Sequence, residues 1–253
     1  MIRFANKEDV SDIRELWDIA FPEEPDFNGY FFENIFDFNN TLVLIKDNKV
    51  VSMAQMMPYE LKNIGKATYI YGAATNPKYR KQGLMSKLLN KSFEIDVENG
   101  VIASILIPAN KPLYDFYGKL GYETCFFANK YTYKAFDKVD EINECNDVKI
   151  LSRIYNGDIV RSDAYWQTQL NMYKALGGKV FCYNNAYAIV SDKVEELMYL
   201  NDNDKEILLN SICKFLKIDA VEVTEIGNSS PVGMMKKHCE FNCGNMYMGL
   251  MYN

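Results

Sequence analysis

Two cations, a glutamine and a glycine stand together at residues 80–83, in the stretch TNPKYRKQGLMSKLL that runs from Thr75 to Leu89. Asn76-Pro77 marks a turn, and the pattern that follows predicts a helix that begins near Gly83. The first turn of a helix presents unpaired backbone N–H groups and a partial positive charge, so it favours anions. Glycine lets an anion approach the main chain closely. These features predict an anion site here; on residue types alone, a capped helix with solvated cations is the alternative.

The hydrophobic pattern predicts the elements that position this corner. Leu84 and Leu88, and likewise Met85, Leu89 and Phe93, recur at the i, i+4 spacing of one helix face. Gly100 ends the expected helix, and the continuous apolar run VIASILI is typical of a strand buried on both faces. Strand, helix and strand of these lengths predict a right-handed βαβ crossover. Strands are expected at 41–46, 50–61, 67–75, 101–107 and 122–133.

A similar pattern restarts after a polar, acidic stretch at 137–147. We expect a helix around 163–176, strands near 179–182, 186–191 and 195–200, a helix at 204–216, a strand at 220–224 and a final strand in NMYMGLMYN. The chain therefore has two halves of similar order. The predicted fold class is α/β (α+β), with two domains at residues 1–138 and 139–253.

Composition narrows the classes of function. The chain has 253 residues, 48% of them hydrophobic, and a formal net charge of −6. This balance, without a long basic run, argues against nucleic acid as the main partner. No apolar run is long enough for a membrane span, so we expect a cytoplasmic protein. The six cysteines are expected to be free thiols and to bind no metal; His238, the only histidine, is expected on the surface.

The segment AATNPKYRKQGLMSKLL resembles the acyl-CoA diphosphate loop of the GCN5-related N-acetyltransferase (GNAT) superfamily, whose pattern is Arg/Gln-x-x-Gly-x-Gly/Ala. Arg80, Gln82 and Gly83 match it, whereas Met85 departs from the final small residue. IPANKPLYDFYGKLGYE resembles the strand and helix in which Tyr-x-x-x-Gly-Tyr/Phe closes the family's second motif. The stretch IVRSDAYWQTQL at Ile159–Leu170 and the terminal MYMGLMYN resemble the second unit of the Eis-like branch. That branch carries two tandem GNAT folds, the second usually without a cofactor loop.

The resemblance implies acetyl-CoA as cofactor and direct attack of an amine on the thioester. Its pantetheine is expected along Ala73, Ala74 and Thr75, and its diphosphate against the N–H groups of the loop. A backbone N–H of the splayed strand is expected to stabilise the oxyanion. The other residues expected to bind the cofactor lie in the loop, in the start of the helix after it and at the cap of the next helix: Arg80, Lys81, Gln82, Gly83, Leu84, Met85 and Asn110.

Tyr117 is the expected general acid for the departing thiolate, whose reference pKa is about 8.5; a phenol, with a pKa of about 10, can supply its proton when it is positioned beside the sulfur. Tyr114, one turn earlier, is the substitute candidate. A core aromatic on an apolar helix face is the alternative for Tyr117. Asn110 is also expected to cap the helix that carries both tyrosines.

An acidic and aromatic stretch follows Phe21 and is expected to attract a cationic acceptor, through Glu23, Glu24, Asp26 and Tyr30. A solvated helix face is the alternative, and the general base stays unassigned. The expected function is N-acetyl transfer to a small-molecule or peptide amine, in a protein that can also form a homo-oligomer. A catalytically silent acyl-CoA-binding module, or a scaffold that binds no coenzyme A, is the competing hypothesis.

Overall fold

The computed structural model describes residues 1–22, 25–136, 142–249 and 251. Met1–Thr124 and Gly233–Asn242 form one compact unit, and Cys125–Val232 forms the second with the residues that follow Asn242. The expected division after residue 138 follows chain order. In the structure, by contrast, a segment from the C-terminal half completes the first unit.

The sheet of the first unit is an antiparallel meander that ends in a parallel pair. Strands β1 to β4 pair antiparallel in chain order, β4 pairs parallel with β5, and β12 lies antiparallel on the other edge of β5. Asp47 and Asn48 have φ angles of 53° and 58° in the β2–β3 turn, as a tight hairpin requires. The strands are β1 (Ile2–Phe4), β2 (Thr41–Lys46), β3 (Lys49–Leu61), β4 (Gly65–Thr75), β5 (Ala103–Leu106) and β12 (Ser230–Lys237).

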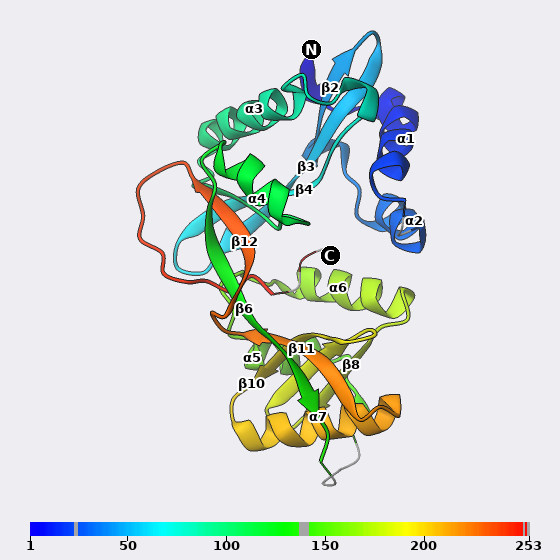
Figure 1. Cartoon of the computed structure of the whole chain (residues 1–253), viewed down its shortest axis with the longest axis vertical. Coiled ribbons are helices and arrows are strands. Elements are labelled where there is room, and N and C mark those ends of the chain that lie inside the picture. The colour runs from blue at the N-terminus through cyan, green and yellow to red at the C-terminus, as the bar shows by residue number, and fades with distance from the viewer. Residues whose placement is uncertain (23–24, 137–141, 250, 252–253) are drawn as a thin grey trace. The chain divides into compact units, whose positions relative to one another are not determined.

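Helices cover both faces of this sheet. In Figure 1, α1 (Val10–Ala20) and α2 (Pro25–Asn34) lie on one side of β3 and β4, and α3 (Leu84–Glu98) and α4 (Lys111–Gly118) lie on the other. Leu84, Leu88, Leu89 and Phe93 are buried, so the predicted apolar face of α3 is confirmed. Three short 3-10 turns complete the unit: η1 (Lys7–Asp9), η2 (Phe38–Asn40) and η3 (Pro77–Tyr79).

The second unit has the same kind of sheet. β11 pairs antiparallel with β6 and parallel with β10, and β9, β8 and β7 follow as antiparallel neighbours. Each unit is thus a mixed, mostly antiparallel sheet with one parallel pair, which confirms the predicted fold class. The elements are β6 (Glu123–Lys134), β7 (Asn143–Glu144), α5 (Val148–Ile154), α6 (Asp163–Ala175), β8 (Lys179–Tyr183), β9 (Ala186–Val190), β10 (Val194–Tyr199), α7 (Asp202–Leu216) and β11 (Ala220–Ile226).

A buried carboxylate joins four segments of the first unit. Asp96 of α3 is 2% exposed; its Oδ1 accepts a hydrogen bond from Thr68 Oγ1 at 2.6 Å, and its Oδ2 accepts one from Ser104 Oγ at 2.6 Å. His238 Nε2 lies 3.2 Å from the same Oδ2. The expectation of a surface histidine is wrong, because the His238 side chain is 4% exposed in this cluster. Thr68 and Ser104 are partners across the parallel ladder. Asp96 therefore fastens α3 to the part of β4 and β5 where the two strands pair with each other.

Replacement of Asp96 by alanine is expected to lower the free energy of unfolding by about 3 kcal/mol, because it leaves buried donors without their acceptor. Glu98→Ala is the matched control, since Glu98 is exposed on the same helix. Urea denaturation of both variants measures the difference. Equal stability of the two variants would mean that the cluster does not fasten the strands.

Two expectations about the second unit are wrong. Cys145 and Cys182 form a disulfide, where free thiols were expected. Where the final segment is described, at residues 245–249 and 251, it forms a single bridge between Met246 and Phe126 instead of a strand, although Met248 and Met251 are fully buried. Among the described residues, no helix combines the length and the apolar character needed to cross a bilayer.

Candidate active site

The loop between β4 and α3 has the backbone conformation of an anion cradle. Arg80 is extended, Lys81 has a φ of 62° and Gly83 has a φ of 70°. Left-handed residues that alternate with extended or right-handed ones turn successive N–H groups toward one point, which is the geometry of an anion-binding nest. Lys81 adopts this conformation despite its side chain, so the loop holds a backbone state that favours glycine.

The amides of the first turn of α3 are open to a ligand. Gly83 is the N-cap residue and has no side chain to accept from them, and Lys87 N donates to Gly83 O at 3.0 Å. The N–H groups of Leu84, Met85 and Ser86 precede this first helical bond, so they have no carbonyl partner within the helix. A Cβ built on Gly83 meets nothing within 4 Å. The space beside Gly83 is therefore empty of protein.

A cleft of about 480 Å³ opens beside this loop. Ala20 and Phe21 from the end of α1, Leu113 and Phe116 from α4, and Tyr79 and Ser86 near the loop were not predicted to line it. Sequence spacing does not reveal them, because α1 and α4 reach the cleft only through the tertiary fold. Nine of the predicted site residues line the cleft: Ala73, Ala74, Thr75, Arg80, Lys81, Gly83, Leu84, Met85 and Tyr117.

A bulge shapes the β4 wall of the cleft. Met53 pairs with Ala74 and Gln55 pairs with Tyr71, so Gly72 and Ala73 together face one residue of β3. Such a bulge leaves a backbone group outside the ladder. Gly72 has a φ of 56°, and a Cβ on it would lie 2.4 Å from the Trp17 ring. The absence of a Cβ on Gly72 therefore lets the Trp17 indole pack directly against the bulge.

The parallel ladder beside the bulge is short. It joins Ala67 to Ala103, Thr68 to Ser104 and Tyr69 to Ile105, whereas β4 continues to Thr75. Beyond Tyr69 the two strands are unpaired with each other, and this opening lies next to the bulge. Ligands favour such carboxyl-end openings of parallel strands.

Tyr117 brings an ionisable group to the cleft. Its side chain is 7% exposed, and its ring packs against Tyr122 and Phe116 at centroid distances of 5.6 and 5.1 Å. Burial raises the pKa of Tyr117 to about 12, because the charged phenolate loses its hydration. The phenol is therefore protonated at neutral pH and can donate.

Three predicted residues near the cleft do not line it. Gln82 Oε1 accepts from Lys46 Nζ at 3.1 Å, and Asn110 Oδ1 accepts from Leu113 N at 3.2 Å as the cap of α4. Tyr114 is half-buried, and burial raises its pKa. The side chains of Gln82 and Asn110 are committed to other protein groups.

The predicted acceptor residues lie elsewhere. Asp26 is exposed and Tyr30 is half-buried on α2, and neither lines the cleft. Glu23 and Glu24 lie outside the described residues. The cleft lining within the described part of the chain holds no carboxylate, so the structure assigns no general base.

Comparison with known proteins decides the family. Residues 1–125 match the family model described as an acetyltransferase (GNAT) domain. The chain therefore contains a GNAT domain over these residues. It is therefore an acyltransferase, and acetyl-CoA is its cofactor, as the sequence predicted.

Solved structures extend the likeness of this GNAT protein to nearly the whole chain. A probable N-acyltransferase from Enterococcus faecalis V583 is 18% identical with a TM-score of 0.73, and covers 94% of this chain and 72% of its own. A putative acetyltransferase from Pyrococcus horikoshii is 17% identical with a TM-score of 0.67, and the match covers 100% of this chain and 94% of that protein. Eis1 from Mycobacterium abscessus is 12% identical with a TM-score of 0.66, and the match covers 94% of this chain and 73% of Eis1. At these identities the likeness shows the fold alone. A search of curated proteins returns no match.

The cleft of this GNAT protein fits an acyl-CoA. The open amides and the cations Arg80 and Lys81 suit a diphosphate. The edge of β4 at Ala73–Thr75, with which β5 does not pair, suits the amide-bearing pantetheine arm, and the aromatic side chains of Phe21 and Phe116 add apolar lining to the cleft. These are the groups that a nucleotide diphosphate with an amide-bearing arm requires.

Proposed function

We propose that this protein transfers an acetyl group from acetyl-CoA to a primary amine, on a small molecule or a lysine side chain, by direct attack of the amine. The observation that carries the proposal is the convergence of three features on one cleft. They are the open amides after Gly83, the bulge at Gly72 and Ala73, and the protonated phenol of Tyr117.

Each feature has one task in this mechanism. The amides of the α3 first turn bind the diphosphate and fix the position of the acyl end. A backbone N–H that the bulge leaves unpaired donates to the oxygen on which negative charge develops. Tyr117 Oη gives its proton to the thiolate sulfur as the carbon–sulfur bond breaks. The amine loses a proton to a base that the described residues do not identify.

We propose that only the first domain binds the cofactor. In the second unit, α7 follows β10 as α3 follows β4, but its first turn carries Asp202 and Asp204. Asp204 N donates to Asn201 Oδ1 at 2.9 Å, and Asp204 Oδ2 accepts from Asn201 Nδ2 at 2.7 Å and from Asn185 N at 3.1 Å. Burial raises the pKa of Asp204, but these hydrogen bonds outweigh burial and lower it. A carboxylate that is charged at neutral pH thus occupies the place of an anion, and a diphosphate would be repelled.

A screen for thiol release tests the proposed reaction. Acetyl-CoA is supplied with aminoglycosides, polyamines, amino acids or lysine-containing peptides, and free thiol is measured over time. We expect release that depends on the amine and on the protein. Coenzyme A binding without amine-dependent release across these classes would favour the silent acyl-CoA-binding module, which the absence of a carboxylate from the described cleft lining keeps in consideration. Absence of any coenzyme A binding by calorimetry would contradict both hypotheses.

A further inference from the structure

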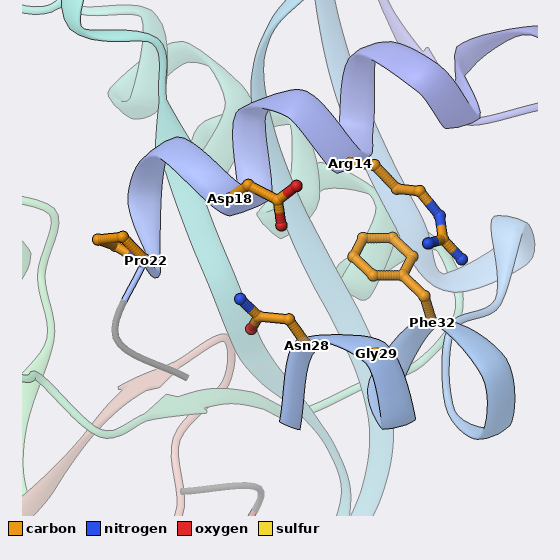
Figure 2. Close-up of a pocket in the computed structure, with 6 residues that line it drawn as sticks. All are labelled: Arg14, Asp18, Pro22, Asn28, Gly29 and Phe32. Carbon is orange, nitrogen blue, oxygen red and sulfur yellow. The ribbon is translucent and has the colours of Figure 1, made fainter. Parts of the chain in front are cut away.

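A second hollow, of about 440 Å³, lies between α1 and α2. Figure 2 shows its lining: Arg14 and Asp18 come from α1, and Asn28, Gly29 and Phe32 come from α2 and face them, with Pro22 at the end of α1. No residue of this lining belongs to the lining of the acyl-CoA cleft. We call it the α1–α2 pocket.

The walls of the α1–α2 pocket are held together by a buried amide. Asn28 is 6% exposed; its Oδ1 accepts from Trp17 Nε1 at 2.8 Å, and its Nδ2 donates to Phe21 O at 2.8 Å. Trp17 also stacks on Phe31 of α2 with ring centroids 4.4 Å apart. These contacts join the two helices at fixed points, so the pocket exists before a ligand arrives. Asn28 has little capacity left for a ligand, which leaves recognition to Arg14 and Asp18.

Arg14 and Asp18 carry opposite charges one helical turn apart on the same face of α1. Within the part of the chain that the structure describes, neither charged group makes a hydrogen bond or ion pair. The guanidinium carbon of Arg14 lies 4.6 Å from the centroid of the Phe32 ring. This cation–π contact steadies the guanidinium by its face and leaves its N–H edges open. The pocket therefore offers a donor fork and a carboxylate that are both available.

The floor beside these charges has no side chain. A Cβ built on Gly29 meets nothing within 4 Å, and Gly29 lies inside α2. Glycine in a helix interior lowers stability relative to alanine, so its presence here favours a role for the empty space. Phe32 and Pro22 add apolar surface to the same hollow.

We infer that the α1–α2 pocket binds the zwitterion of a free α-amino acid. The ligand carboxylate accepts from the Arg14 guanidinium, the ligand ammonium donates to the Asp18 carboxylate, and the ligand side chain lies over Gly29 against Phe32. A guanidinium fork matches a carboxylate geometrically. A ligand with both charges satisfies both groups, whereas a simple amine or a simple carboxylate leaves one of them without a partner. This site is distinct from the acyl-CoA cleft, since it shares no lining residue with it.

Ligand-observed NMR with the standard amino acids and the whole chain tests the inference. For the best binder, two analogues are then titrated: the amide, which lacks the carboxylate, and the deamino acid, which lacks the ammonium. We expect the amino acid to bind about tenfold more tightly than either analogue. In Arg14→Gln the preference over the amide is lost, and in Asp18→Asn the preference over the deamino acid is lost.

Gly29→Leu and Glu15→Gln complete the design. The leucine side chain fills the pocket without a clash at Cβ, so binding of the amino acid is expected to disappear. Glu15 is exposed on the same helix and does not line the pocket, so its variant is expected to bind as the wild type does. Coenzyme A affinity is expected to be unchanged in all four variants, which reports an intact first unit. The inference is overturned if no amino acid binds, if the amide binds as tightly as the acid, or if binding is unchanged in Arg14→Gln and Asp18→Asn.

Discussion

Gly83→Val is expected to raise the Kd for coenzyme A by about 100-fold, with each hydrogen bond to a charged phosphate contributing about 1.5 kcal/mol or more. The Cβ position of Gly83 meets no protein atom within 4 Å, so the new methyl groups project into the space reserved for the diphosphate. They hold the phosphate away from the amides of Leu84 and Met85, and at least two hydrogen bonds are lost.

Backbone strain is separated from ligand exclusion by Gly100→Val. Gly100 lies just beyond the other end of α3, has a φ of 67° beside 70° for Gly83, and its Cβ position is equally open. Valine in the left-handed region costs about 1–2 kcal/mol at either position, so both variants lose similar stability in urea denaturation. Only Gly83→Val is expected to lose affinity by isothermal calorimetry. Equal affinities in the two variants would remove the diphosphate from this loop.

Local pattern was sufficient to predict the parts of this site that one continuous segment builds. The apolar face of α3 follows from i, i+4 spacing, and the open amides follow from the helix start itself. The β2–β3 hairpin is equally local, because Asp47 and Asn48 tolerate the left-handed conformation that a two-residue turn demands. In each case the physical cause lies within a few residues of its effect.

The features that the sequence did not reveal depend on partners far along the chain. His238 and Asp96 are 142 residues apart, and β12 pairs with β5 although the two strands are distant in the sequence. The bulge at Gly72 is an intermediate case. An isolated glycine within a strand pattern indicates a bulge, but the reason for it here is the Trp17 ring beneath, which only the fold reveals.

Side-chain direction limits the prediction of the site in the same way. Tyr114 and Tyr117 lie three residues apart on α4, yet only Tyr117 lines the cleft. Gln82 lies beside Gly83, but Lys46 from β2 engages its side chain. A motif places its main chain well, because the loop conformation is local. It does not place side chains whose partners come from other elements.

Tyr117→Phe is expected to lower kcat by about 100-fold, the usual range for loss of a general acid, with the Kd for acetyl-CoA nearly unchanged. Phenylalanine keeps the ring in its packing against Tyr122 and Phe116 and removes only the hydroxyl. The diphosphate contacts come from a different element, so binding is unaffected. Tyr114→Phe is the matched control on the same helix, and it is expected to keep the wild-type kcat because Tyr114 does not line the cleft. If Tyr117→Phe turns over at the wild-type rate, the thiolate receives its proton from another group.

The pH profile gives a second test of the same residue. A general acid acts in its protonated form, and burial raises the pKa of Tyr117 from 10.0 to about 12. The phenol therefore keeps its proton as pH rises through 10. Deprotonation of Tyr117 is expected to lower kcat of the wild type only near pH 12. A solvent-exposed phenol would instead give that fall near its ordinary pKa of 10.0. Thiol release is measured by stopped flow from pH 7 to 10.5, and folding is checked by circular dichroism. Over this range we expect kcat of the wild type to follow the same pH dependence as kcat of Tyr117→Phe. A fall in kcat near pH 10 that is present in the wild type and absent from the variant would contradict this prediction. It would mean that Tyr117 loses its proton as a solvated phenol does and that burial does not raise its pKa.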